Sequence, residues 1–181
     1  LHCDLKPSNV LLTAGPDPSV KLCDMGLAQR LPIDAREQTI GVRGTPRYMA
    51  PEVVFRAYSF PADVYSFAIC LYELLHSKRF LAAHSPLDGL LTVIVGDRPT
   101  AGLRPAEMDA LDPREKCFAS AAAALIEECW RYAWEDRPTI AQVVGAIAQS
   151  LELAELPCPL GYSLSQAITH EASGWAEVRV P

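Results

Sequence analysis

The stretch His2-Cys3-Asp4-Leu5-Lys6-Pro7-Ser8-Asn9-Val10-Leu11-Leu12 places a carboxylate, an ammonium group and an amide close together, directly before an apolar run. A polar segment ahead of such a run predicts a loop that leads into a β-strand. A second β-like run, Val20-Lys21-Leu22-Cys23, follows a turn over residues 14–18 that is rich in Gly and Pro. We therefore expect a small antiparallel hairpin behind the polar loop.

The rest of the chain changes character after this hairpin. Glycine and proline residues break any regular period between Asp24 and Pro51, which predicts a long irregular loop, and such loops are usually functional. Apolar residues at three-to-four spacing then predict four helices, over residues 61–75, 87–95, 118–130 and 139–151. We expect a mainly α domain over residues 1–155 and an unassigned tail over residues 156–181.

Composition excludes several classes of protein. The net charge of −6 and the pI near 5.2 argue against a nucleic-acid partner. The longest apolar stretch, residues 64–75, is too short for a membrane helix, and the N-terminus does not resemble a signal peptide. The six cysteines form no CxxC pair, so we expect reduced and mostly buried thiols.

Five motifs, taken together, resemble the eukaryotic-type protein kinase family. Residues 2–9 resemble its catalytic loop, and residues 21–26 its metal-binding turn, with Met where Phe is usual. The nine residues 44–52, Gly-Thr-Pro-Arg-Tyr-Met-Ala-Pro-Glu, resemble the end of the activation segment. Residues 63–68 and 136–139 resemble the start of the central helix and a late Arg motif. The resemblance is to the C-terminal lobe, closest to the tyrosine-kinase-like branch of Ser/Thr kinases.

The resemblance implies ATP- and Mg²⁺-dependent transfer of a phosphoryl group to a protein substrate. Such a transfer needs a carboxylate for the attacking hydroxyl, a cation near the phosphoryl group and oxygen ligands for the metal. By resemblance Asp4 is the catalytic base, Lys6 contacts the γ-phosphate, and Asn9 and Asp24 bind Mg²⁺. Any one of these residues, taken alone, would be interpreted as a solvated loop residue.

Apolar residues beside these motifs receive roles in the same way. Leu11 is expected to form the floor beneath the adenine ring, with Val10 and Leu12 packed into the core, although a plain strand core explains the pattern equally well. Met25 is expected to fill the pocket that Phe usually occupies. Cys23 borders the nucleotide pocket by resemblance, and we expect it to be buried and inert.

A further set of residues is expected to support the site without doing chemistry. Glu52 is expected to pair with Arg137, because an unpaired buried charge would be costly. Asp63 is expected to accept main-chain N–H bonds from the catalytic loop. His2 belongs to the same support, as does Thr45, whose hydroxyl is expected to bond both the Asp and the Lys of the catalytic loop.

Specificity and control also follow from the resemblance. Lys6 together with Thr45 indicates Ser/Thr rather than Tyr transfer. Cys3 stands where most kinases have the Arg that binds a phosphate on the activation loop, so activity is expected not to require that phosphate. Thr39 is the most plausible phosphosite by position, and a plain polar loop residue is nearly as plausible.

The leading hypothesis is a protein Ser/Thr kinase, and the alternative is a pseudokinase or scaffold that binds partners without catalysis. The N-terminal lobe, with its Gly-rich loop, strand Lys and partner Glu, is expected to be absent ahead of Leu1. An upstream N-terminal lobe is therefore expected to be required, and residues 1–181 alone to be inactive and poorly soluble. The expected location is the cytoplasm, or the cytoplasmic side of a membrane receptor.

Overall fold

The computed structural model describes residues 1–14, 19–31, 38–39 and 41–155. The predicted hairpin is present: the 3₁₀ turn η1 (Pro7–Asn9) leads into β1 (Val10–Leu12), which pairs antiparallel with β2 (Val20–Leu22). Most of the predicted turn, and the whole predicted tail, lie outside the described residues. The pairing sets Leu11 opposite Lys21.

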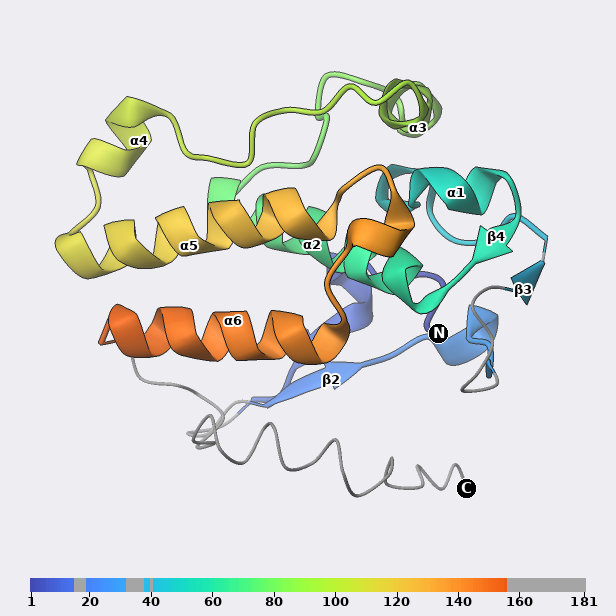
Figure 1. Ribbon diagram of the computed structural model, residues 1–181, viewed down its shortest axis with the longest axis horizontal. Helices are drawn as coiled ribbons and strands as arrows, with labels where there is room; N and C mark the ends of the chain where they lie inside the picture. The colour runs from blue at the N-terminus through green and yellow to red at the C-terminus, as the bar shows by residue number, and fades with distance from the viewer. Residues whose placement is uncertain (15–18, 32–37, 40, 156–181) are drawn as a thin grey trace.

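The expected burial of this hairpin was wrong. Leu12 is 72% exposed and Val10 is only half-buried, so neither belongs to the core. Leu11, the expected adenine floor, is 51% exposed. The physical reason is that the short hairpin lies at the edge of the helical body, below α6 in Figure 1, instead of between two layers. An apolar strand at such an edge keeps much of its surface open.

The segment expected to be an irregular loop contains short ordered elements. They are η2 (Met25–Leu27), β3 (Gln38–Thr39), η3 (Pro46–Tyr48), α1 (Pro51–Val54) and β4 (Ala57–Tyr58). β3 pairs antiparallel with β4, with Gln38 opposite Tyr58. A two-residue strand gives too short a period to be recognised in sequence, so the pairing had to come from the tertiary fold.

Helices dominate the described residues from Phe60 onward (Figure 1). They are α2 (Phe60–His76), α3 (Pro86–Ile94), α4 (Pro105–Asp109), α5 (Pro113–Cys129), η4 (Trp134–Asp136) and α6 (Ile140–Leu153). The four predicted helices are confirmed, although α5 begins at Pro113 instead of Phe118. It begins there because the Asp112 carboxylate accepts the N–H bonds of Arg114 and Glu115, both at 2.8 Å, in a capping box.

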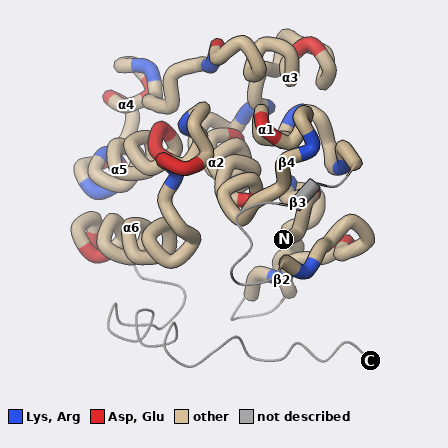
Figure 2. Tube along the Cα trace, turned by 45° about the vertical axis from the view of Figure 1, so that its right-hand side comes forward, with Lys and Arg blue, Asp and Glu red and all other residues tan. Residues whose placement is uncertain are grey.

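The core is built around α2. This helix packs against α5, and α5 in turn packs against α6, which runs back alongside it in Figure 1. Tyr72 of α2, Phe80 and Trp130 form an aromatic cluster with ring centroids 5.5–5.9 Å apart, and the Tyr72 and Phe80 rings meet edge to face. Acidic and basic residues are distributed over the outer elements (Figure 2).

The thiols are less buried than expected. Among the five cysteines that the structure describes, Cys129 is buried, Cys117 is exposed, and Cys3, Cys23 and Cys70 are half-buried. The expectation of a buried Cys23 was therefore wrong. No helix in the described ranges has both the length and the apolar character needed to cross a lipid bilayer.

Candidate active site

Hydrogen bonds attach the start of the catalytic-loop segment, residues 2–9, to α2. The main-chain N–H groups of His2 and Cys3 donate to the two carboxylate oxygens of Asp63, at 2.6 and 3.0 Å. Asp63 lies in the first turn of α2, and the helix fixes the direction of its side chain. Cys3 has a φ of 64°, a conformation that non-glycine residues adopt rarely. Two charge-assisted hydrogen bonds from one rigid helix hold the loop in this conformation, as expected for Asp63.

His2 connects the same loop to the segment before Asp24. Its Nε2 lies 3.1 Å from the Cys23 carbonyl oxygen, and its Nδ1 accepts the main-chain N–H of Asp4 at 3.3 Å. A carbonyl oxygen can only accept, so Nε2 carries the hydrogen and Nδ1 supplies the lone pair. The imidazole therefore joins the two segments of the chain that carry Asp4 and Asp24.

Asp4, Lys6 and Thr45 form a closed triangle of side-chain hydrogen bonds. The Lys6 ammonium group donates to Asp4 Oδ2 at 2.7 Å and to Thr45 Oγ1 at 2.8 Å. The Thr45 hydroxyl donates to Asp4 Oδ1 at 2.7 Å, and the Thr45 main-chain N–H donates to the same oxygen at 2.8 Å. The expected double contact of Thr45 is confirmed, over a separation of about forty residues in the chain.

Gly44 makes this close approach possible. Its φ is 101°, and a Cβ atom at this position would lie 2.5 Å from the carbonyl oxygen of Cys3. Only glycine tolerates both the backbone conformation and the contact. The position of Thr45 over Asp4 therefore depends on the glycine before it.

The Asp4 carboxyl is buried but strongly hydrogen-bonded. Burial alone would raise its pKa, but the hydrogen bonds from Lys6 and Thr45 outweigh burial, so the pKa lies below its ordinary value. Asp4 is therefore a carboxylate at neutral pH. It can accept a hydrogen bond from a hydroxyl group, and its oxygens are fixed by their partners.

The two expected metal ligands differ in environment. Asn9 is buried and its amide N–H₂ donates to the Asp4 carbonyl at 2.9 Å, which leaves its Oδ1 as the acceptor of the side chain. Asp24 is exposed and has a left-handed φ of 62°. The main-chain N–H of Cys23 donates to the Asn9 carbonyl at 3.0 Å, which joins the two segments.

These two residues fit a magnesium ion better than a softer metal. One carboxylate and one amide oxygen, completed by phosphate oxygens and water, are the ligands that Mg²⁺ prefers. Within the residues that the structure describes, no cluster of three or more His, Cys, Asp or Glu side chains forms an all-protein cage.

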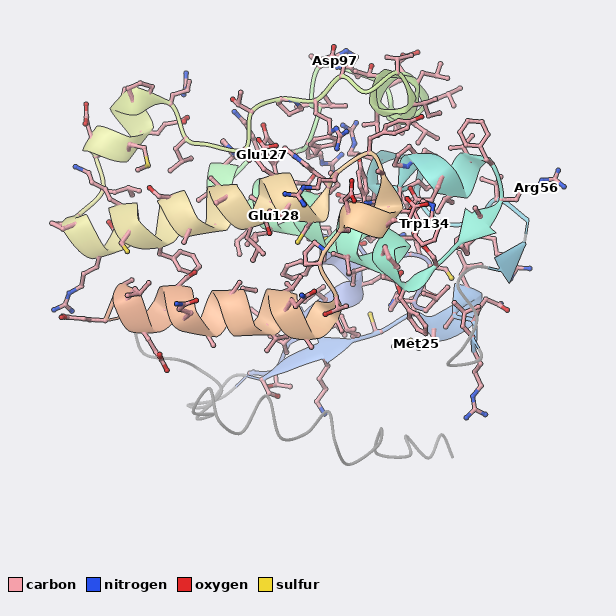
Figure 3. All side chains as sticks on the ribbon, in the orientation of Figure 1. Met25, Arg56, Asp97, Glu127, Glu128 and Trp134 are labelled. Carbon is pink, nitrogen blue, oxygen red and sulfur yellow. The ribbon has the colours of Figure 1, made fainter. Side chains whose placement is uncertain are left out.

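Met25 does not take the position expected for it. It is 55% exposed and stands at the periphery of the molecule (Figure 3). An apolar side chain can fill a pocket only where other elements supply walls, and η2 lies beside the open hairpin. The expectation that Met25 fills a core pocket was wrong for this structure.

The supporting ion pair between Glu52 and Arg137 is confirmed. Arg137 donates from both terminal nitrogens to the two oxygens of Glu52, at 2.6 and 2.8 Å. The Arg137 side chain is fully buried and that of Glu52 is 10% exposed. Arg137 also donates to the carbonyl of Pro61 at 3.0 Å, and its guanidinium lies over the Tyr65 ring. The pair thus connects α1, the start of α2 and the segment before α6.

Sequence reasoning missed one contact that fixes the segment after β3. Tyr58 is buried, and its hydroxyl donates to the Arg43 carbonyl and accepts the Arg43 main-chain N–H, both at 2.6 Å. Together with the β3–β4 pairing, this reciprocal bond attaches the segment before Thr45 to β4. A single tyrosine in a short stretch of mixed residues carries no periodic signal that would have revealed the contact.

The geometry defines a carboxylate, an ammonium group and a buried amide held together by hydrogen bonds in a mainly α lobe. The family model of the protein kinase domain matches residues 1–146. The chain is 34% identical over 149 residues, 80% of its length, to the serine/threonine-protein kinase VIK of Arabidopsis thaliana, of which it covers 31%. It is 32% identical over 181 residues, 96% of its length, to the mouse ankyrin repeat and protein kinase domain-containing protein 1, of which it covers 23%.

A third relative is the dual specificity protein kinase shkC of Dictyostelium discoideum, 32% identical over 151 residues, with 81% of the chain and 27% of that protein covered. The chain therefore belongs to the protein kinase family, and its fold is that of the C-terminal lobe of the kinase domain. It spans less than a third of the length of these relatives.

Proposed function

We propose that residues 1–155 are the C-terminal lobe of an ATP- and Mg²⁺-dependent kinase that phosphorylates Ser or Thr in proteins. The observation that carries the proposal is the triangle of Asp4, Lys6 and Thr45. It presents a fixed carboxylate beside a fixed ammonium group, which is the pair that phosphoryl transfer to a hydroxyl requires. Membership of the kinase family supports the same conclusion.

Each member of the triangle has a distinct task in this proposal. Asp4 accepts the hydrogen bond of the substrate hydroxyl, orients it and takes its proton. Its lowered pKa makes it a weak base, which suffices because the transition state is loose and positioning contributes most of the catalysis. Lys6 places positive charge beside the transferred phosphoryl group, and the Thr45 hydroxyl fixes the Lys6 and Asp4 side chains relative to each other.

Asn9 and Asp24 would hold Mg²⁺ together with the phosphates of ATP. The ion neutralises phosphate charge when it is bound. Leu11 stays the candidate for the floor beneath the adenine ring, because its exposed side chain is available to a ligand. The exposed apolar side chains of the β1–β2 hairpin also support the requirement for an N-terminal lobe, which would cover Leu12 and complete the ATP site.

The assignment to Ser/Thr transfer rests on Thr45 and Lys6. Names of the relatives include both serine/threonine and dual specificity kinases. Phosphoamino-acid analysis of an acceptor protein labelled by the full-length chain tests the assignment. Phosphoserine or phosphothreonine without phosphotyrosine is expected, and abundant phosphotyrosine would contradict it.

Two contacts support kinase activity that does not require a phosphate on the activation segment. The β3–β4 pairing and the Tyr58–Arg43 bonds attach this segment to β4 by uncharged interactions. Cys3 leaves the loop without the usual Arg at that position. Thr39→Ala in the full-length chain is expected to keep at least a third of its activity, and loss of essentially all activity would refute this mode of control.

The central experiment is phosphate transfer from labelled ATP by the full-length natural chain. Asp4→Asn is expected to lower kcat by a factor of about 100 or more, because the amide cannot take the proton. Asp97→Asn is the matched control, since Asp97 is exposed on the loop after α3 (Figure 3), and its activity is expected within twofold of the unaltered chain. Binding of ATP without any transfer by the unaltered chain would favour a pseudokinase or scaffold instead.

A further inference from the structure

A cleft of about 500 Å³ lies between the segment after α3 and the C-terminal end of α5. Asp97 from that segment and Glu127 from α5 both line it, and they are labelled in Figure 3. The segment after α3 lies above α5 in Figure 1, whereas the β1–β2 hairpin lies below α6. None of the proposed catalytic or metal-binding residues lines this cleft. It is therefore a separate feature of the lobe.

Hydrogen bonds hold both walls of the cleft in place. Glu127 accepts the Ala101 main-chain N–H at 3.0 Å on one oxygen and the Trp130 indole N–H at 2.7 Å on the other. This carboxylate thus joins the segment after α3 to the end of α5. Arg137 donates to the Arg131 carbonyl at 2.8 Å, which fixes the wall that follows α5. The cleft is therefore formed before any ligand binds.

Two arginine side chains bring unused hydrogen-bond donors to the cleft. Arg98 is half-buried, and its guanidinium forms no hydrogen bond or ion pair with another described residue. Arg131 donates to the Asp136 carbonyl at 3.0 Å and lies 3.5 Å from Glu128, so part of its fork stays open. By contrast, both oxygens of Glu127 already accept hydrogen bonds. Since a shielded donor without an acceptor is costly, the cleft favours a ligand that accepts hydrogen bonds.

A buried hydroxyl near Arg98 also lacks a partner. Tyr65 of α2 is fully buried, and within the part of the chain that the structure describes its hydroxyl forms no hydrogen bond. Burial raises the pKa of Tyr65, and the positive charge of Arg98 opposes this rise more than that of Arg137 does. The Arg137 guanidinium lies only 5.0 Å from the centre of the Tyr65 ring, so Arg98 is close to this side chain as well. Two unpaired donors are therefore neighbours beside the cleft.

The lining of the cleft is typical of a protein interface. Small-molecule pockets of this size are mostly apolar, whereas charged and polar side chains line most of this cleft. Trp130, Arg131 and the half-exposed Tyr132 are of the residue types enriched where proteins bind one another. The planar guanidinium fork matches the two oxygens of a carboxylate. A phosphate dianion fits less well, because Asp97 and Glu127 bring negative charge to the same cleft.

We propose that this cleft is a docking site for a protein partner that inserts a carboxylate side chain between Arg98 and Arg131. Tyr132 packs against the apolar residue that neighbours this carboxylate in the partner. No step of phosphoryl transfer passes through the cleft. The inference therefore goes beyond the proposed kinase function, and it applies equally to a scaffold without catalysis.

The test measures the binding of fluorescent peptides to the full-length natural chain by fluorescence anisotropy. The peptides come from an array of pentapeptides with a central Glu and an apolar residue beside it, screened against the unaltered chain and Arg98→Met. The affinity of the best peptide is expected to fall about tenfold or more in Arg98→Met and about threefold or more in Arg131→Met. An array in which no peptide distinguished the unaltered chain from Arg98→Met would overturn the inference.

Changes in the peptide test the chemistry of the partner. Gln in place of the central Glu should lower the affinity about tenfold, because the amide has lost the charge and one acceptor oxygen. Equal binding of the two peptides would rule out recognition of a carboxylate. Phosphoserine at the same position should bind no more tightly than Glu, since its second charge is repelled. Tighter binding of the phosphopeptide would overturn the assignment to a carboxylate.

Thermal unfolding separates a binding role of Arg98 from a structural one. Its side chain has no partner among the described residues, so Arg98→Met should leave Tm within about 2 °C of the unaltered chain. A larger fall would mean that Arg98 supports the fold, and the assignment would fail. Arg98→Lys keeps the charge without the fork, and full affinity in this variant would contradict bidentate binding. Arg56→Met is the matched control, since its side chain extends away from the molecule (Figure 3), and its affinity should stay within twofold.

Nuclear magnetic resonance locates the bound peptide. The Trp130 indole N–H bonds Glu127 in the wall of the cleft, so its signal should shift when the Glu peptide is added to a chain with isotopically labelled tryptophan. The Gln peptide at the same concentration should leave the signal in place. Binding of the Glu peptide without any change at Trp130 would place it elsewhere on the molecule and overturn the proposed site.

Discussion

The catalytic loop and the β1–β2 hairpin follow each other directly in sequence but are held in different ways. Polar side chains from distant elements fix the loop: Asp63 holds its N–H groups and Thr45 its carboxylate. The hairpin is held mainly by its own strand pairing, and its apolar side chains are largely exposed. The loop that carries Asp4 is thus preorganised, whereas the hairpin leaves apolar surface exposed.

Removal of the buried Glu52–Arg137 ion pair should have the largest effect on the preorganised part of the molecule. Arg137→Met in the full-length chain leaves the Glu52 carboxylate without its partner, and we expect a loss of about 3–5 kcal/mol in the free energy of unfolding. Denaturant titration measures this loss. Arg131→Met is the control, because its pair with Glu128 at 3.5 Å is exposed and should contribute no more than about 1 kcal/mol. Equal effects in the two variants would contradict the difference in burial.

A pair of aliphatic truncations measures the contrast between the two regions. Ile69→Ala in α2 removes a fully buried side chain and should cost about 2–5 kcal/mol. Leu12→Ala in β1 removes a largely exposed one and should cost no more than about 0.5 kcal/mol in residues 1–181. Thermal or chemical unfolding of both variants provides the comparison. If Leu12→Ala lowered the free energy of unfolding more in the full-length chain than in residues 1–181, another lobe would be shown to cover the hairpin. That result would refine the contrast between the two regions.

The hydroxyl of Thr45 tests how the loop depends on the activation segment. Thr45→Val removes the group that joins Asp4 and Lys6, and kcat should fall about tenfold to a hundredfold, as expected for hydrogen bonds to charged groups. Steady-state kinetics of the full-length chain checks this. Thr92→Val is the control, because its hydroxyl donates to the Asp88 carbonyl within α3 and, among the described residues, contacts no part of the site. A fall of the same size in the control would show that the effect is not specific to the site.

Thiol chemistry gives the smallest of the expected effects. Burial, and then the charge of Asp63, raise the pKa of the Cys3 thiol to about 11, and burial raises the pKa of Cys129 to about 12. Both are protonated at pH 7.5, and thiolate forms only as the pH approaches these values. Iodoacetamide with mass spectrometry should therefore label the exposed Cys117 several-fold faster than Cys3. Cys3 labelled as fast as Cys117 would contradict its burial.

Much of the architecture could be predicted from the sequence because the signals are local. The four long helices follow from apolar periodicity, and the hairpin from two apolar runs around a Gly- and Pro-rich turn. The bonds of Asp63, Thr45 and the Glu52–Arg137 pair were predicted because each lies in a motif that resembles a known family. The burial of Leu12 and Met25 was predicted wrongly, since burial depends on what lies opposite a side chain.

The sequence by itself determined the family, the order of the hairpin and the four predicted helices, and the residue types at the proposed site, because these depend on contiguous motifs and local periodicity. Only the tertiary structure decided how the site is held. Hydrogen bonds join segments that are distant in the chain: Arg47 donates to the carbonyls of Leu81 and His84, and Tyr58 donates to the carbonyl of Arg43. The exposure of the apolar hairpin side chains likewise depends on which elements lie opposite them. Such contacts depend on how helices and turns pack, and no local pattern of residues specifies that packing.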